Sequence, residues 1–137
     1  MEISIIIVNY NTCDLTLQCL QSVYEKTVDV GFEVIVVDNA SSDNSVEMIK
    51  KMFPQVKIIE SVENLGFGKA NNLGVKYANG DYLFLLNSDT ILISNVIFEF
   101  YRFMQKSPQI AACGGNLIDA SGNSCLLYTS PSPRDTR

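Results

Sequence analysis

The sequence contains no histidine and no tryptophan, and the lack of histidine excludes Ser-His-Asp and Cys-His catalysis by this chain alone. Its four cysteines have no CxxC spacing, so they indicate free buried thiols rather than a zinc site or a redox pair. Acidic residues outnumber basic ones, and a net charge of −5 argues against broad binding of nucleic acid or anionic lipid. What remains is chemistry carried by carboxylates, amides and hydroxyls.

Long apolar runs are also missing, since none approaches the roughly 20 residues of a membrane helix. The first residues, MEISIIIV, lack the basic start and the small-residue cleavage site of a signal peptide. An apolar fraction of 47% with 18% charged residues is typical of a folded globular chain, and 137 residues suit one domain. We therefore expect a cytoplasmic single-domain protein without a membrane span.

The C-terminal residues differ in character from the rest. From Cys125 the sequence reads CLLYTSPSPRDTR, and the earlier periodicity is lost. The segment from Cys125 to Asp135 resembles the translation of a transposon-type sequencing adapter. We therefore expect the biological sequence to end near Ser124 and residues 125–137 to be an adapter-derived, non-native and disordered tail.

Before that tail, apolar runs of strand length alternate with segments of helical periodicity. The expected strands are 3–8, 33–37, 56–59, 82–86 and one that begins at 110–113. The expected helices carry apolar residues at three- and four-residue spacing: Leu17, Leu20, Val23 and Tyr24; Val46, Ile49 and Phe53; Ala70, Leu73 and Tyr77; and Ile97, Phe100, Tyr101 and Met104. Asn11 or Thr12 is expected to cap the first helix. This alternation predicts right-handed βαβ units and an α/β fold with a parallel sheet.

Polar clusters follow three of the expected strands. They are Asn9-Tyr10-Asn11, Asp38-Asn39 and Asn87-Ser88-Asp89. Ligands of open parallel sheets bind beyond the carboxyl ends of the strands, so the three clusters predict a binding site at that edge. Each cluster taken alone also suits a turn or a helix cap.

The loop NLGFGKANN, from Asn64 to Asn72, has two interpretations. Its glycines allow a backbone to approach a phosphate ahead of a helix N-terminus, and they serve equally well as a plain turn. The loop matches neither a Walker motif nor a GxGxxG fingerprint. Lys69 adds one cation, which is either a ligand contact or a solvated side chain.

Taken together, the segments IIIVNYNT, VIVVDNASSDNS, NLGFGKANNLG and FLLNSDT resemble the family-2 glycosyltransferases, in particular their rhamnosyltransferase-type members. The resemblance covers residues 1–124. It implies a GT-A fold, which is a Rossmann-like, mostly parallel sheet with helices on both faces, here truncated. Residues 1–124 would then be the N-terminal, nucleotide-sugar-binding part of a glycosyltransferase domain. The activity implied is transfer of a sugar from a nucleotide-diphosphate donor to an acceptor hydroxyl.

The resemblance also implies roles for individual residues. Nucleotide-sugar binding is implied for Val8, Asn9, Tyr10, Asp38, Asn39, Gly66, Lys69, Asn87 and Ser88. Asn87-Ser88-Asp89 matches the DxD motif of the family, and Asp89 is the expected ligand of Mg2+ or Mn2+. Such a cation stabilises the charge of the departing diphosphate, and it needs few protein carboxylates because phosphate oxygens supply other ligands. Asn87 replaces the first acid of the motif.

No general base is identified within the chain. The family is expected to be inverting and to carry its base downstream of the DxD motif. Glu99 is interpreted as a residue of a helix surface and Asp119 as a residue of a hairpin, so the base is expected beyond Ser124. On this interpretation the chain alone would be inactive.

The partners implied are a dTDP- or UDP-sugar donor and a glycan or lipid-linked saccharide acceptor, in synthesis of cell-surface polysaccharide or glycolipid. The work would take place in the cytoplasm or at the inner face of the cell membrane. Two alternatives stay open. One is a nucleotide-sugar-binding module without turnover. The other is a nucleotidyltransferase, which predicts a glycine- and arginine-rich loop after the first strand that VNYNT lacks.

Overall fold

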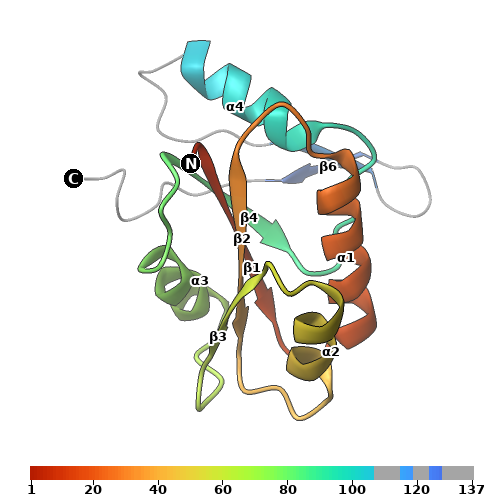
Figure 1. Ribbon diagram of the computed structural model, residues 1–137, viewed down its shortest axis with the longest axis vertical. Helices are drawn as coiled ribbons and strands as arrows, with labels where there is room; N and C mark the ends of the chain where they lie inside the picture. Colours follow the sequence, from red (N-terminus) through yellow and green to blue (C-terminus); the bar gives the residue numbers. More distant parts are fainter. Residues whose placement is uncertain (107–114, 119–123, 128–137) are drawn as a thin grey trace.

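The computed structural model describes residues 1–106, 115–118 and 124–127. Strands and helices alternate along the chain (Figure 1). The strands are β1 (Ile3–Asn9), β2 (Phe32–Asp38), β3 (Lys57–Glu60), β4 (Tyr82–Asn87), β5 (Gly115–Ile118) and β6 (Ser124–Leu127). The helices are α1 (Cys13–Lys26), α2 (Ser45–Met52), α3 (Phe67–Val75) and α4 (Val96–Lys106).

The first four strands form one parallel sheet in the order β3-β2-β1-β4. The chain builds outward from β1 to β3, and α3 then carries it back to the free side of β1, where β4 pairs. The strand order therefore reverses beside β1, which is the kind of switch point where open α/β sheets bind ligands. The prediction of an α/β fold with a parallel sheet is confirmed.

Helices cover both faces of this sheet, as Figure 1 shows with α3 on one side and α1 and α2 on the other. Alternate residues of β1 explain the arrangement. Ile3, Ile5 and Ile7 pack with α1, α2 and α4 in the larger core, whereas Ile6 lies on the face covered by α3. Full burial of each isoleucine contributes roughly 1.5–3 kcal/mol. A strand covered on both faces is mostly apolar, which accounts for the run Ile5–Val8; the one polar residue before it in β1, Ser4, is buried with Glu33 as its hydrogen-bond partner.

The packing of α3 is close because it presents Gly74 to the sheet. A Cβ atom at this position would lie 2.8 Å from Ile6 Cγ2 and 3.0 Å from Val37 Cγ2. The helix ends at Val75, two residues before Tyr77, which is 49% exposed. The prediction that Tyr77 continues the apolar face of this helix is therefore wrong, because the helix ends before that residue.

The amino edge of the sheet has its own polar cluster, centred on Glu33. Its carboxylate accepts hydrogen bonds from Ser4 Oγ at 2.6 Å and from the backbone N–H of Asn79 at 2.7 Å, and Lys57 lies 3.9 Å away. Burial by itself raises the pKa of Glu33, but these hydrogen bonds and the lysine charge outweigh it and lower that pKa. The cluster fastens the Asn79-Gly80 turn to the start of β1.

The last two strands form an antiparallel pair, with Gly115 opposite Leu127. The strand expected to begin at 110–113 and the hairpin residue Asp119 lie outside the described residues. Residues 125–127, which we expected in a disordered tail, are paired in β6, and residues 128–137 lie outside the described part. The adapter origin of the tail stays a prediction. Within the described residues, no helix combines the length and apolar content needed to cross a membrane.

Candidate functional site

The register of the sheet brings the three polar clusters together at its carboxyl edge. Asn9 at the end of β1 lies opposite Asp38 at the end of β2, and Val8 lies opposite Asn87 at the end of β4. The loop after β3 is joined to the same edge, because the backbone N–H of Ser61 donates to the carbonyl of Asp38 at 2.9 Å. Segments separated widely in sequence therefore line one side of the molecule.

At the centre of this edge, the side chain of Asn9 is fully buried, with 0% exposed. Its Nδ2 donates to Asp38 Oδ1 at 2.7 Å and to Ser41 Oγ at 3.2 Å. Its Oδ1 accepts from Thr12 Oγ1 at 2.9 Å and from Thr16 Oγ1 at 2.6 Å. An amide side chain has two N–H donors and two acceptor lone pairs, so the protein itself satisfies this one. Asn9 therefore acts on the site by positioning its neighbours.

The loops after β1 and β2 are fastened to each other by a second set of hydrogen bonds. Asn11 Oδ1 accepts from the backbone N–H groups of Ser42 at 2.7 Å and Asp43 at 3.2 Å. In return, Ser41 Oγ accepts from the N–H of Asn11 at 2.9 Å, and Asp43 Oδ2 accepts from the N–H of Cys13 at 3.3 Å. Asn11 takes a left-handed conformation (φ 52°), which asparagine tolerates better than most residues.

The sequence predicts that Asn11 or Thr12 caps α1, but the structure shows no side-chain cap from either residue. Thr12 occupies the N-cap position, but its side chain does not cap the helix and turns instead to Asn9. Instead, the carboxylate of Asp43, in the loop after β2, accepts a hydrogen bond from the backbone N–H of Cys13 at the start of the helix. Local sequence could not reveal this exchange, because Cys13 and Asp43 are separated by the whole of α1 and β2.

Asn39 joins the second strand to the glycine loop. Its Oδ1 accepts from the N–H of Leu65 at 2.7 Å, and its Nδ2 donates to Asn64 Oδ1 at 2.9 Å. Gly66 follows in a left-handed conformation (φ 81°), which an L side chain rarely adopts. Lys69 lies exposed in the first turn of α3. The loop therefore has a defined position relative to β2, and its cation faces solvent.

The segment after β4 is held differently. Residues 87–90 form a tight turn, hereafter the β4 turn, closed by a hydrogen bond from the N–H of Thr90 to the carbonyl of Asn87 at 3.1 Å. Asn87 and Asp89 are exposed. Beneath them the thiol of Cys19 donates to the carbonyl of Asn87 at 3.7 Å. Burial, with the nearby charge of Asp89, raises the pKa of Cys19 to about 12, so this thiol stays protonated at neutral pH.

The predicted site residues fall into three groups by exposure. Buried are Asn9, Asp38 and Asn39; partly buried are Val8 and Ser88; exposed are Tyr10, Gly66, Lys69, Asn87 and Asp89. Only the last two groups offer surface to a ligand. The residues that organise the buried group include Thr12, Thr16, Ser41 and Asn64, which the sequence analysis did not assign. Their signal was slight, because hydroxyl and amide residues are ordinary in loops.

Asp89 is suited to a divalent cation. Its carboxylate forms no hydrogen bond or ion pair with the described residues, and the amide of Asn87 is two positions away on the same turn. No group of three or more acidic, cysteine or histidine side chains is gathered for a metal in the part of the chain that the structure describes. A site here would use one carboxylate and take its other ligands from phosphate and water, a donor set that Mg2+ and Mn2+ accept.

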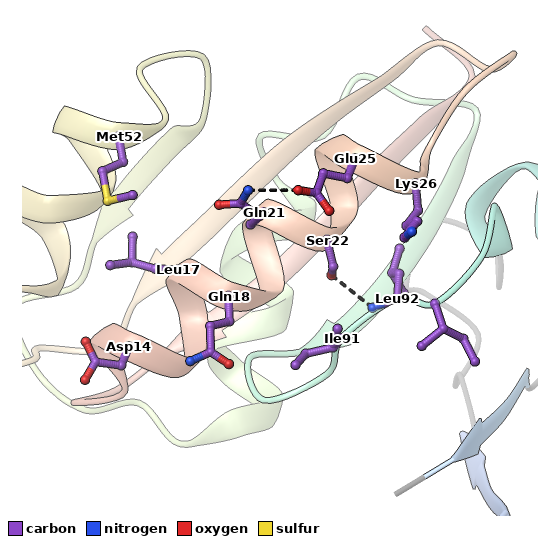
Figure 2. A pocket seen from close by; sticks show the side chains of 11 residues that line it. Asp14, Leu17, Gln18, Gln21, Ser22, Glu25, Lys26, Met52, Ile91 and Leu92 are labelled. Atoms are coloured by element: carbon purple, nitrogen blue, oxygen red, sulfur yellow. Dashed lines mark hydrogen bonds between the residues drawn. The ribbon is translucent and has the colours of Figure 1, made fainter. Parts of the chain in front are cut away.

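A groove of about 740 Å³ lies elsewhere, along the outer face of α1 (Figure 2). It is lined by Asp14, Leu17, Gln18, Gln21, Ser22, Glu25, Lys26, Met52, Ile91, Leu92 and Ile93. Ser22 Oγ accepts from the N–H of Leu92 at 2.9 Å, which ties the segment after the β4 turn to the helix. None of the predicted site residues lines this groove, so the polar edge and the groove are separate features.

Comparison with known proteins matches this arrangement to a family. The model of glycosyl transferase family 2 matches residues 4–127. The chain belongs to this family. The match includes all four strands of the sheet and the β4 turn.

Two curated members of the family illustrate its relatives. The chain is 34% identical over 112 residues to the poly(ribitol-phosphate) beta-glucosyltransferase of Bacillus spizizenii, which covers 78% of this chain and 18% of that protein. It is 29% identical over 132 residues to the glycosyltransferase GlyG of Streptococcus pneumoniae, which covers 93% of this chain and 44% of that protein. The chain therefore spans less than half the length of either relative.

Solved structures share the fold. The chain superposes on residues 1–349 of TarS from S. aureus with a TM-score of 0.69 and 26% identity, over 77% of this chain and 33% of that one. The same TarS segment has been solved in complex with UDP and with UDP-GlcNAc. The mannosyltransferase PcManGT of Pyrobaculum calidifontis, solved with GDP-Man and Mn2+, gives a TM-score of 0.70 at 24% identity, which is a likeness of fold. The expected GT-A architecture is confirmed.

Proposed function

We propose that this family-2 chain is the donor-binding part of a glycosyltransferase, which binds a nucleotide-diphosphate sugar at the carboxyl edge of its sheet. The observation that carries the proposal is the position of Asp89. An exposed carboxylate that has no hydrogen bond or ion pair with the described residues lies in the β4 turn, beside loops that the network around Asn9 and Asp38 holds in place. A preorganised surface of this kind lowers the entropic cost of binding.

The exposed residues suggest which part of the donor each loop would contact. The ring of Tyr10, 47% exposed, offers an aromatic face to a base. Val8 and the backbone near Asp38 and Asn39 would complete the nucleoside side. Gly66 and Lys69 would lie toward the sugar-phosphate part. The likeness to TarS, which was solved with UDP and UDP-GlcNAc, supports this class of ligand.

The proposed cation is Mg2+ or Mn2+, with Asp89 as its protein ligand and Asn87 and Ser88 beside it. Bound there, a divalent cation would neutralise charge on the diphosphate as it leaves. The role of the protein is to hold one carboxylate at the end of β4. Oxygen ligands are the ones these cations prefer, and histidine is not required.

The finer features belong to the same proposal. The donor would be a dTDP- or UDP-sugar, with rhamnose as one candidate, and transfer would be inverting. The acceptor would be a glycan or a lipid-linked saccharide in the synthesis of cell-surface polysaccharide or glycolipid, in the cytoplasm or at the inner face of the membrane. Synthesis of a surface polymer is supported by the relative named for poly(ribitol-phosphate).

The test is calorimetric titration of the chain with UDP, UDP-GlcNAc and dTDP-rhamnose in the presence of Mn2+. Asp89→Ala should weaken binding by about tenfold to a hundredfold, because a charge-assisted contact contributes roughly 1.5–3 kcal/mol. Asp81→Ala is the matched control, since Asp81 is an exposed acid just before the opposite end of β4. It should bind as the unaltered chain does.

Two results would contradict the proposal. One is equal affinity of the Asp89→Ala variant and the unaltered chain. The other is the absence of binding to all three nucleotides. Binding without transfer to any acceptor would support the alternative of a nucleotide-sugar-binding module for this chain.

A further inference from the structure

We infer that Thr12 is a positioning residue that couples the nucleotide loops to the metal-binding turn, so that nucleotide and cation bind cooperatively. This inference rests on the proposed function and goes beyond it. Its starting point is that Thr12 is the side chain that connects the two parts of the site. Its Oγ1 lies 2.9 Å from Asn9 Oδ1 and 3.4 Å from Ser88 Oγ, although Thr12 and Ser88 are 76 positions apart.

The chemistry of a hydroxyl makes this contact a choice rather than two simultaneous bonds. Thr12 has one hydroxyl proton, so it donates to one acceptor at a time, and the acceptors within reach are Asn9 at 2.9 Å, Thr16 Oγ1 at 3.1 Å and Ser88 at 3.4 Å. The shorter distance to Asn9 favours that acceptor in the structure described. A small movement of the β4 turn toward Thr12 would shorten the distance to Ser88 and shift the preference.

Turning the Thr12 hydroxyl from Asn9 to Ser88 costs little free energy, because a second hydroxyl also donates to Asn9. Thr16 Oγ1 donates to Asn9 Oδ1 at 2.6 Å, so the buried amide oxygen keeps a partner when Thr12 turns away. An unsatisfied buried acceptor would otherwise cost about 1–3 kcal/mol. Thr16 is fully buried, and among these distances only Thr12 reaches the β4 turn. The two threonines therefore have distinct roles.

Movement at Ser88 is transmitted to Asp89 because both belong to one closed turn. The hydrogen bond from the N–H of Thr90 to the carbonyl of Asn87 spans them at 3.1 Å. Holding Ser88 in place therefore also holds the backbone from which the Asp89 side chain extends. A nucleotide that contacts the β1 loop and shifts the Thr12 hydroxyl toward Ser88 would favour the cation-binding position of the turn, and a cation would favour the nucleotide by the same factor.

The experiment measures the affinity of the chain for UDP with Mn2+ and with EDTA, and takes the ratio as the cation-dependent gain. Thr12→Val keeps the shape and removes the hydroxyl, so the gain should fall by about threefold to tenfold, the range that one hydrogen bond supplies. Thr12→Ser should restore the gain to within about twofold. Thr27→Val, at a buried threonine just beyond the other end of α1, is the matched control and should leave the gain unchanged.

A double variant separates coupling from general damage. In the Ser88→Ala background, Thr12→Val should have no further effect on the gain, because the contact is already lost. If Thr12→Val does not fold, Ser88→Ala alone should reduce the gain, and an unreduced gain would overturn the inference.

Other outcomes are equally decisive. An unaltered gain in Thr12→Val, or an equal loss in Thr27→Val, would show that Thr12 has no coupling role even though UDP binds as proposed. If the unaltered chain does not bind UDP with Mn2+, the inference falls together with the proposed function.

Discussion

The two sides of the candidate site are built in different ways. The loops after β1 and β2 are fastened to each other by the Asn9–Asp38 pair and by Asn11 and Asp43, which exchange hydrogen bonds with the opposite loop. The side chains of the neighbouring described elements, by contrast, reach the β4 turn through two long polar contacts, at 3.4 Å from Thr12 in the β1 loop and at 3.7 Å from Cys19 in α1. The side proposed for the nucleotide is thus organised by the protein's own hydrogen bonds, whereas the side proposed for the metal has weaker contacts with the described residues.

This difference has a physical reason. A nucleotide has a fixed shape, and a surface organised in advance avoids paying its ordering entropy at the moment of binding. A divalent cation brings its own strong field and can draw a flexible carboxylate into place. Polar side chains that are buried must be satisfied by the protein, and those that remain exposed are satisfied by water until a ligand displaces it.

The largest loss of stability is expected for Asn9→Ala, which removes the central residue of the hydrogen-bonded loops after β1 and β2. It removes four hydrogen bonds and leaves the buried Asp38 and two threonine hydroxyls short of partners, so the free energy of unfolding should fall by about 2–4 kcal/mol. Asn87→Ala, on the exposed turn, should change it by less than about 0.5 kcal/mol. Urea denaturation followed by circular dichroism measures both. Equal effects would mean that the two sides are held alike.

A smaller effect is expected at the link to the glycine loop. Asn39→Ala should lower the free energy of unfolding by about 1–2 kcal/mol, because the N–H of Leu65 loses its acceptor. Hydrogen exchange at Leu65 should become faster, which locates the change. Asn72→Ala, an exposed asparagine of α3, is the control and should leave that exchange rate unaltered. Unchanged protection of Leu65 in the Asn39 variant would show that the loop is held by other contacts.

The smallest expected effect is on pH dependence. Burial raises the pKa of Asp43, but hydrogen bonds from Ser45 and from the N–H of Cys13 outweigh it and lower that pKa below its usual value. A depressed carboxyl pKa stabilises the folded state above the unfolded-state value near 3.8, and this contribution is lost as pH falls through the folded-state pKa. Asp43→Asn should therefore flatten the stability profile between neutral and acidic pH. Urea midpoints measured across that range test this. The same slope of stability against pH in the unaltered chain and the variant would refute it.

Local pattern predicted much of the fold. The strands expected at 3–8 and 82–86 lie at Ile3–Asn9 and Tyr82–Asn87, because apolar runs covered on both faces are readable residue by residue. The polar ends of these strands were also predicted. The burial of Asn9 was not, and neither was the turn of Thr12 away from its helix. The burial of Asn9 depends on Asp38 and Ser41, which lie far along the chain, and the N–H of Cys13 at the start of α1 is taken by the equally distant Asp43.

The sequence by itself determined the alternation of strands and helices and the placing of Asn9, Asp38 and Asp89 at the ends of strands. The tertiary structure alone decided that β4 lies beside β1, that Asn9 meets Asp38, and that Thr12 approaches Ser88. Periodicity and turn chemistry act over a few residues and can be read locally. Strand order and register depend on how helices pack against both faces of the whole sheet, and that packing has no local signature.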